Sequence, residues 1–401
     1  MLSTNKIRTR FPIYRTTKNL IYLDTAASAL KLDCAIKAQD DYYRLNGTNI
    51  HRGVYNLSFI ATSEYEKARE VVAKFINANS NEVVFTKGTT DSLNRVSRML
   101  CELINEGDEI ISSELEHHSS ILPWIEIAKR KKAIVKYIPL TKDGKITITN
   151  FKKVLTSRTK VVAITHVSNV TGDETPLKEI AQLAKENNAF VIVDSAQAVL
   201  HSKVDVKDLG IDFLAFSGHK IYGPSGIGVL YGKEKLINEL DPGEYGGEMV
   251  NHVSFDNATY KDAPLRLEAG TQNIAGALGL AKSIEYIDSI GIYEISRHSA
   301  FLKKYTLKQM KEIDGIVIHN VKSNGSIIVF NVIGIHPHDA ATFLDQEGVC
   351  VRAGHHCAQL INNFYGVDAT IRASFSIYNN KKDCDLFIEA LKKCVDFFKQ
   401  F

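Results

Sequence analysis

The amino-acid sequence predicts an α/β protein in which a mostly parallel sheet is flanked by helices. Through the first two-thirds of the 401 residues, short apolar runs typical of strands alternate with helical patterns. The run Phe190–Val193 is apolar throughout, as is typical of a central strand buried on both faces. From about Ile274 to Met310 helical periodicity dominates, which marks the passage to a second, smaller domain.

Composition places the chain among ordinary globular proteins. It is 44% hydrophobic and 24% charged, with a net charge of +3 and no basic block, so we expect no nucleic-acid partner. No apolar run approaches the roughly 18 residues of a membrane-spanning helix, and we expect no membrane association. The first twenty residues are basic but lack the apolar core of a secretory signal, which favours a surface helix there.

The cysteines show no paired spacing of the kind that holds a metal ion, so we expect free thiols and no metal site. They are Cys34, Cys101, Cys350, Cys357, Cys384 and Cys394. Such sparse cysteines are typical of a reducing compartment. We therefore expect a cytoplasmic protein, with an organelle stroma or matrix left open.

The chain's central feature is a strand–loop–strand pattern that displays Lys220. The apolar run Phe213–Phe216 ends in Ser-Gly-His-Lys, a turn rich in glycine and proline follows, and a second apolar run begins. A partly desolvated lysine amine in this position suits Schiff-base chemistry. Ser217 and His219 are short donors that could hold an anionic group beside it. Taken by itself, Lys220 would more readily be interpreted as a solvated loop lysine.

Two earlier stretches place polar side chains in loops. A short strand leads from Ile21 into a turn of small residues, and a polar loop with His51 follows. His51 could line the mouth of a site or simply be solvated. The strand Val83–Phe85 enters a loop in which Thr89 and Thr90 directly precede a helix. A helix N-terminus with hydroxyl donors suits a phosphate group, although a plain helix cap is the alternative.

Two further strands also end in polar loops. The loop after residues 109–113 carries His117 and His118, and we expect the next helix to begin near Pro123. An imidazole there can stack on a flat ring or move protons, although a lone histidine is more often structural. The strand in residues 159–165 ends in a loop that carries Asn169.

The buried strand Phe190–Val193 ends at Asp194, and Gln197 follows three residues later. A carboxylate at a buried strand end needs a cationic partner. A pyridinium nitrogen is such a partner, because an aspartate beside it keeps the nitrogen protonated. The alternative, a metal-binding aspartate, lacks nearby histidine or carboxylate ligands.

Two stretches near the C-terminus complete the set. Cys357 lies in a Gly-His-His loop after a short apolar strand, where the imidazoles and Arg352 would favour the reactive thiolate. Arg372 lies between apolar neighbours and suits a bidentate carboxylate clamp. The alternatives are an inert cysteine and a surface arginine.

Together these residues make up a site for pyridoxal phosphate (PLP). From Tyr22 to Asn379 the chain resembles the Suf-type, group II cysteine desulfurases among the class V aminotransferase-like PLP enzymes. The motifs that carry the resemblance occur in family order: YLDTAAS, HRG, GTTDSLN, ELEHHSS, THVSNVTG, VDSAQA, SGHKIYGPSGIG, EAGTQN, RAGHHCA and IRASFSIYN. Departures are mild: GTQN stands where GTPN is commoner, Asp91 where glutamate is usual, and Ala353 where threonine is frequent.

The resemblance implies the fold-type I architecture of PLP-dependent transferases. A large PLP-binding domain, residues 18–285, would contain a mostly parallel seven-stranded sheet flanked by helices. A smaller α+β domain, residues 286–401, would follow, joined by the N-terminal segment 1–17. The family also implies a homodimer.

The resemblance assigns the site residues to three groups. The catalytic residues are expected to be Cys357, Lys220 and His117. The cofactor-binding residues are expected to be Lys220, Thr89, Thr90, His117, Asn169, Asp194, Gln197, Ser217, His219 and Thr271. The substrate-binding residues are expected to be Arg372, Asn169, Arg352 and His51.

The implied roles follow from the family. Lys220 would bond to PLP and act as base at the substrate Cα, Asp194 would pair with the pyridinium, and Gln197 with the ring hydroxyl. Thr271 would reach the phosphate of the other subunit. Cys357 would attack the sulfur of L-cysteine, leaving a persulfide on the enzyme and releasing L-alanine. The sulfur would pass to an acceptor protein of SufE or SufU type for iron–sulfur cluster assembly.

Three alternatives stay open beside this function. A selenocysteine lyase, giving alanine and selenide, shares the fold and the cofactor. A PLP aminotransferase or kynureninase-like hydrolase would have no use for Cys357. A catalytically idle scaffold is disfavoured by the intact Lys220, Asp194, His117 and Cys357.

Overall fold

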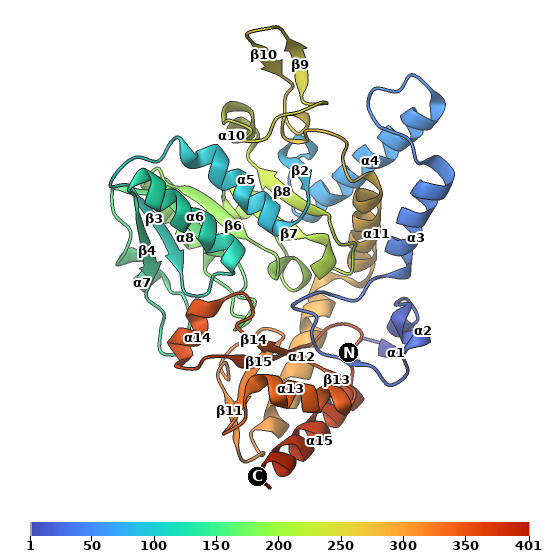
Figure 1. Ribbon diagram of the computed structural model, residues 1–401, viewed down its shortest axis with the longest axis vertical. Coiled ribbons are helices and arrows are strands. Elements are labelled where there is room, and N and C mark those ends of the chain that lie inside the picture. The colour runs from blue at the N-terminus through green and yellow to red at the C-terminus, as the bar shows by residue number, and fades with distance from the viewer. Residues whose placement is uncertain (1, 401) are drawn as a thin grey trace.

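A seven-stranded sheet forms the centre of the larger lobe of the protein (Figure 1). The structure is a computed structural model that describes residues 2–400. In spatial order the strands are β2 (Val83–Thr86), β8 (Gly228–Gly232), β7 (Phe213–Ser217), β6 (Phe190–Asp194), β5 (Thr159–Thr165), β3 (Glu109–Ser113) and β4 (Ile134–Ile138). Of these strands β8 alone runs opposite to the others, so the prediction of a mostly parallel seven-stranded sheet is confirmed.

Helices cover both faces of this sheet, because successive residues of its strands point to opposite sides. Ile110 and Val161 belong to the core beneath α5 and α6, whereas their neighbours Ile111 and Val162 belong to the core beneath α4, α8 and α11. The helices of this lobe are α3 (Asp33–Asp41), α4 (Asn56–Phe75), α5 (Thr89–Cys101), α6 (His118–Lys131), α7 (Ile148–Lys152), α8 (Leu177–Glu186), α9 (Val206–Leu209), α10 (Glu234–Glu239) and α11 (Ile274–Ile290). A hairpin of β9 (Val250–Val253) and β10 (Ala258–Tyr260) projects from its top (Figure 1).

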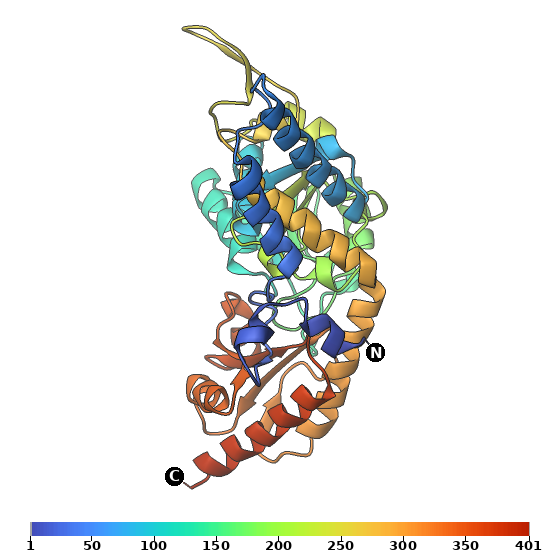
Figure 2. The same cartoon turned by 90° about the vertical axis from the view of Figure 1, so that its right-hand side faces the viewer.

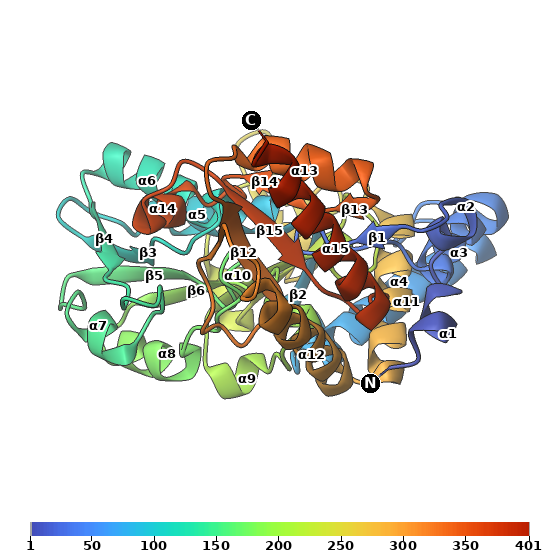
Figure 3. The same cartoon turned by 90° about the horizontal axis from the view of Figure 1, so that it is seen from below.

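The smaller lobe has its own sheet and its own core. Its antiparallel sheet has the order β11 (Ile316–Ile318), β12 (Ile327–Val332), β15 (Thr370–Ser374) and β14 (Arg352–Gly354). The helices of this lobe are α12 (Ile292–Met310), α13 (Pro337–Gln346), α14 (Gln359–Tyr365) and α15 (Lys381–Phe398). Seen from below, α12, α13 and α15 lie over this sheet (Figure 3).

One residue, Gly291, separates α11 from α12, and the two helices link the lobes in a nearly continuous run (Figure 2). The division that we proposed at residues 285 and 286 stays a prediction, because the core of the larger lobe also takes in Ile327 and Val329 of β12. No helix within residues 2–400 is both long and apolar enough to cross a bilayer.

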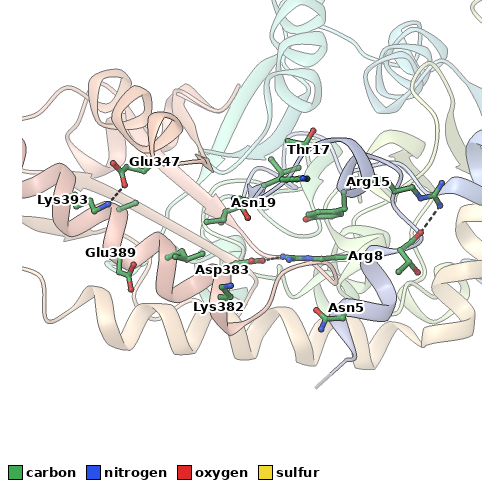
Figure 4. Close-up of a pocket in the computed structure, with 17 residues that line it drawn as sticks. Asn5, Arg8, Arg15, Thr17, Asn19, Glu347, Lys382, Asp383, Glu389 and Lys393 are labelled. Carbon is green, nitrogen blue, oxygen red and sulfur yellow. Dashed lines mark hydrogen bonds and ion pairs between the residues drawn. The ribbon is translucent and has the colours of Figure 1, made fainter.

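The N-terminal segment packs against the smaller lobe. It contains two short helices, α1 (Thr4–Arg8) and α2 (Ile13–Thr16), and not the single helix that we predicted. Its strand β1 (Ile21–Tyr22) pairs in parallel with β13 (Val349–Cys350). Arg8 forms an ion pair with Asp383 of α15 at the edge of a hollow of about 760 Å³ (Figure 4). These contacts hold the segment against the smaller lobe.

The carboxyl ends of β2, β3, β5, β6 and β7 lie along one edge of the large sheet, because these strands run in the same direction. Apart from Thr271, each residue predicted to bind PLP lies at the end of one of these strands or shortly after it. In α/β proteins ligands bind at this edge. The fold therefore gathers residues that are distant in sequence.

Candidate active site

Lys220 and Asp194 lie at the ends of the neighbouring strands β7 and β6. Asp194 is buried and accepts a hydrogen bond from the Ala196 N–H at 2.9 Å. Burial raises the pKa of Asp194, and the charge of Lys220 opposes that rise. Burial lowers the pKa of Lys220, whereas the charges of Asp194 and Cys357 raise it. An amine whose pKa is lowered is a better nucleophile and base at neutral pH.

The residues predicted to hold a phosphate group gather where β2 and β7 end. The Thr89 N–H donates to Ser217 Oγ at 2.8 Å, and the two hydroxyl oxygens lie 2.7 Å apart. Thr90 is exposed beside them. His219 Nδ1 lies 3.3 Å from Ser28 Oγ, and burial lowers the pKa of His219 to about 4. A helix N-terminus beside clustered hydroxyls offers several donors to one anion.

His117 caps α6, and the prediction that this helix begins near Pro123 is wrong. The imidazole Nδ1 accepts the Ser119 N–H at 3.1 Å, and the helix already begins at His118. The physical reason is that a side-chain acceptor satisfies a free N–H of the first turn, so the helix begins well before Pro123. Burial and then the charge of Lys220 lower the pKa of His117 to about 3. The ring is therefore neutral at physiological pH.

Glu116 is a buried carboxylate that sequence inspection missed. It accepts hydrogen bonds from Ser113 Oγ at 2.7 Å, the Thr165 N–H at 3.0 Å and Ser120 Oγ at 2.8 Å. These donors belong to β3, β5 and α6, so the carboxylate ties two strand ends to the start of the helix. Burial raises the pKa of Glu116 to about 7, and the charge of Asp194 adds to the rise.

Replacing Glu116 with glutamine should change how stability depends on pH. The pKa of Glu116 is about 7 in the folded protein, against 4.5 for an ordinary glutamate. Between these two pH values the folded state therefore binds more protons than the unfolded state, and the free energy of unfolding falls as the pH rises. Glu116→Gln removes this loss of stability. The variant should gain up to about 3 kcal/mol relative to wild type between about pH 5 and pH 8. Denaturant unfolding of both proteins would measure it, and a pH-independent difference would contradict it.

Arg372 on β15 has a buried guanidinium group, one nitrogen of which has no hydrogen-bond partner among residues 2–400. Its Nη1 donates to the Asn169 carbonyl at 2.7 Å, and its Nη2 lies 3.4 Å from the Asp24 carboxylate. Its Nε has no hydrogen-bond partner among residues 2–400. Burial lowers the pKa of Arg372 to about 10, so the group stays charged at neutral pH. Such a donor set can receive a carboxylate.

Arg352 also binds Asp24. Its Nε and Nη2 lie 3.0–3.2 Å from the Asp24 carboxylate oxygens, and these hydrogen bonds are the largest cause that raises the pKa of Arg352. Asp24 therefore bridges Arg352 and Arg372, a role that we did not predict. The signal was present in the sequence, because Asp24 ends the apolar run Ile21–Leu23 just as Asp194 ends the run Phe190–Val193.

The Cys357 thiol is exposed on a loop whose backbone is held on both sides. The Cys357 carbonyl accepts the His118 N–H at 2.7 Å, and the His356 carbonyl accepts Asn169 Nδ2 at 2.8 Å. Both Cys357 and His356 have positive φ angles, 53° and 55°, which non-glycine residues rarely adopt. The loop thus presents the thiol to solvent from a defined backbone position.

Two of the predicted residues do not join this cluster within one chain. Thr271 is exposed before α11, and its hydroxyl makes no hydrogen bond to residues 2–400. His51 Nε2 lies 3.0 Å from Glu66 Oε1 on α4.

Gln197, by contrast, is buried directly after β6, and its Nε2 donates to the Ala26 carbonyl at 2.7 Å.

PLP fits the side chains at this edge of the sheet. Asp194 is buried and has no ion pair among residues 2–400, so a pyridinium nitrogen would be its missing cationic partner. Thr89 and Ser217 would hold the phosphate, Lys220 would bond to the cofactor, and His117 would pack against its ring. When bound, PLP supplies an electron sink for the negative charge that develops on a substrate carbon.

Known proteins share both the sequence and the fold. The aminotransferase class-V family profile matches residues 21–387. A probable cysteine desulfurase from Halalkalibacterium halodurans is 44% identical, over 99% of each chain. Two solved cysteine desulfurases, from Thermococcus onnurineus and Escherichia coli, have TM-scores of 0.95 and 0.93. They are 38% and 36% identical, and each alignment covers 99% of both chains.

The fold and the site define a PLP-dependent enzyme with fold-type I architecture. The chain belongs to the aminotransferase class-V family. Within that family, its full-length relatives place it with the cysteine desulfurases, which confirms the resemblance drawn from the sequence.

Proposed function

We propose that this enzyme takes sulfur from L-cysteine, forming L-alanine and a persulfide on Cys357. The observation that carries the proposal is the exposed Cys357 thiol, whose charge couples to the buried site groups Lys220 and Arg372. Binding PLP and deprotonating an amino acid need only the buried groups. The thiol adds a soft nucleophile, which sulfur transfer requires.

The substrate's carboxylate would be held by Arg372. Its free Nε and its Nη2 offer two donors, and Asn169 Nδ2 lies on the adjoining loop. Asp24 competes with the substrate for Nη2 and keeps the guanidinium from being an unpaired buried charge. These contacts would orient the amino acid between Lys220 and Cys357.

The chemistry then divides between two side chains. The Lys220 amine would take the proton from the substrate Cα. The Cys357 thiolate would attack the substrate's sulfur, so that an S–S bond forms, the Cβ–S bond breaks and its electron pair stays with the carbon. Protonation of that carbon gives the methyl group of alanine. The transferred sulfur is oxidised to the sulfane level and the carbon is reduced, so no external oxidant is needed.

Incubation of the PLP-loaded protein with L-cysteine, without any acceptor, tests this function. Amino-acid analysis should find alanine, and mass spectrometry should find one extra sulfur on the peptide that contains Cys357. Pyruvate in place of alanine, or the extra sulfur on another cysteine, would contradict the proposal.

The active protein would be a homodimer formed through an apolar patch on the helical turn after α3, the loop that follows it and α4. The patch consists of Tyr43, Leu45, Val54, Leu57, Phe59 and Ile60. Leu45 and Val54 are 75% and 92% exposed, and Leu45, Leu57 and Ile60 line one hollow of about 530 Å³. Apolar patches of this kind mark interaction surfaces. Dimerisation would also bring Thr271 of one subunit to the phosphate site of the other.

Changing Leu45 and Phe59 together to aspartate should give a monomer that retains PLP poorly, because charges would replace apolar contacts at the interface. Light scattering would report the mass and dialysis followed by absorbance the retained cofactor. Val317→Asp, at an exposed position on β11, is the control and should stay dimeric. A wild-type monomer with full PLP occupancy would rule out the contact by Thr271.

The persulfide would be delivered in the cytoplasm to a protein of SufE or SufU type for iron–sulfur cluster assembly. The exposed position of Cys357 supports transfer to another protein, because a sulfur sealed inside the site could not reach a second thiol.

A further inference from the structure

An open groove of about 610 Å³ extends from the active site between α5 and α6. Thr90 and His117, at the starts of the two helices, line one end together with Cys357, and Cys101 and Arg130 line the other. The helices lie side by side in Figure 1. Cys101 lies eleven positions after Thr90 along α5, so the groove is on the order of 16 Å long at 1.5 Å per residue. A small thiol would occupy only its inner end.

The groove carries unpaired positive charge. Arg98 and Arg130 line it and form no ion pair with residues 2–400. The acidic side chain on its wall, Glu126, is 2.7 Å from Lys129 and also interacts with the charge of Arg130. This one carboxylate is outnumbered by the cations around it, and the net positive charge favours an acidic partner.

The groove also has an apolar wall. Leu122 is 50% exposed, and Pro123 and Ile127 lie beside it on α6. An exposed leucine and two arginines that line one groove offer one apolar and two charged contacts to a single bound segment. Arg98 and Arg130 form no hydrogen bond or ion pair with the predicted PLP residues within residues 2–400, so the reaction with cysteine does not explain these charges.

The loop that carries the thiol is attached to the same wall. The His118 N–H donates to the Cys357 carbonyl at 2.7 Å, and the Gln359 N–H donates to His118 Nε2 at 3.3 Å. The first residue of α6 thus sets the position of Cys357 relative to the groove. A segment bound in the groove would therefore meet the thiol in a fixed register.

We propose that this groove binds an acidic, partly apolar segment of the sulfur-acceptor protein and directs its thiol to Cys357. The inference rests on the proposed function, because it needs a persulfide on Cys357. The acceptor thiolate attacks the outer sulfur, a new S–S bond forms, the old one breaks, and its electron pair returns to Cys357 as thiolate. The persulfide moves to the acceptor with no net oxidation or reduction.

The test uses the PLP-loaded enzyme and whichever SufE- or SufU-type protein accelerates wild-type turnover. Arg98→Glu combined with Arg130→Glu should raise the KM for that acceptor by about tenfold or more, since like charges at an interface repel. Leu122→Asp should act in the same direction. Turnover with dithiothreitol, a small thiol, should be unchanged in every variant. Added salt should reduce the acceptor's acceleration of turnover more in wild type than in the double variant.

Arg10→Glu and Leu386→Asp, at exposed positions on the N-terminal segment and α15, are the matched controls and should keep the wild-type KM. Hydrogen exchange of wild type should also show protection of residues 90–101 and 118–131 when the acceptor is added. An unchanged KM in the groove variants, or protection confined to other elements, would contradict binding of the acceptor in the groove. Either result would leave the proposed function intact. Absence of a persulfide on wild-type Cys357 would overturn the function itself.

Discussion

Cys357→Ser should bind cysteine normally and yet release almost no alanine. Lys220, Asp194 and Arg372 cover cofactor binding, substrate binding and proton removal, so the absorbance change on adding cysteine should persist. Only the transfer of sulfur needs the thiol. Alanine formation should fall by about a thousandfold or more, the scale on which loss of a nucleophile slows other enzymes. Stopped-flow absorbance together with alanine analysis separates the two steps.

Cys350→Ser is the matched control. Cys350 pairs with Tyr22 across β13 and β1, and burial raises the pKa of its thiol, which disfavours the reactive thiolate. This variant should keep wild-type turnover. If Cys357→Ser desulfurates cysteine at the normal rate, the assignment of the nucleophile is wrong. Selenocysteine is a useful second substrate, since selenium leaves carbon more readily than sulfur and should depend less on Cys357.

Lys220→Ala should abolish both the visible absorbance of lysine-bound PLP and turnover. The amine at the end of β7 is the group that we expect to bond to the cofactor and to take the Cα proton, and alanine can do neither. We expect turnover to fall by about a thousandfold or more. The fold should persist, since no hydrogen bond within residues 2–400 depends on the Lys220 side chain. Absorbance spectra and thermal unfolding would measure the two properties.

Lys31 provides a demanding control for Lys220. Burial lowers the pKa of Lys31 to about 8, so it too is an amine with enhanced nucleophilicity. Its Nζ, however, donates to the carbonyls of Ala29 and His219 at 2.8 and 3.0 Å. Lys31→Ala should therefore keep the visible band. A Lys220→Ala protein that retained the band and lost it only on changing Lys31 would move the covalent bond to Lys31.

Much of the succession of strands and helices along the chain could be predicted from the sequence. Strands such as β6 and β7 were recognisable because their apolar runs end abruptly in polar residues, and that local signal also pointed to Asp194 and Lys220. The start of α6 was predicted wrongly, since Pro123 is a visible signal whereas the cap by His117 depends on the rotamer of its side chain. Candidate site residues such as Asp194 and Lys220 were predicted from their position after strands, which requires no knowledge of distant contacts.

Contacts between distant segments were decided by the tertiary structure alone. Asp24 meets Arg372 only because β1 joins the smaller lobe, and Glu116 collects donors from three elements that converge at one sheet edge. Arg352 was expected beside the thiolate, and the charge of Cys357 does act on it, but its hydrogen-bond partner is a carboxylate more than 300 positions away. The sequence by itself determined which groups occupy the strand ends, because hydrophobic periodicity is local. Their pairing and their pKa values depend on burial and distance, which arise only when the chain folds.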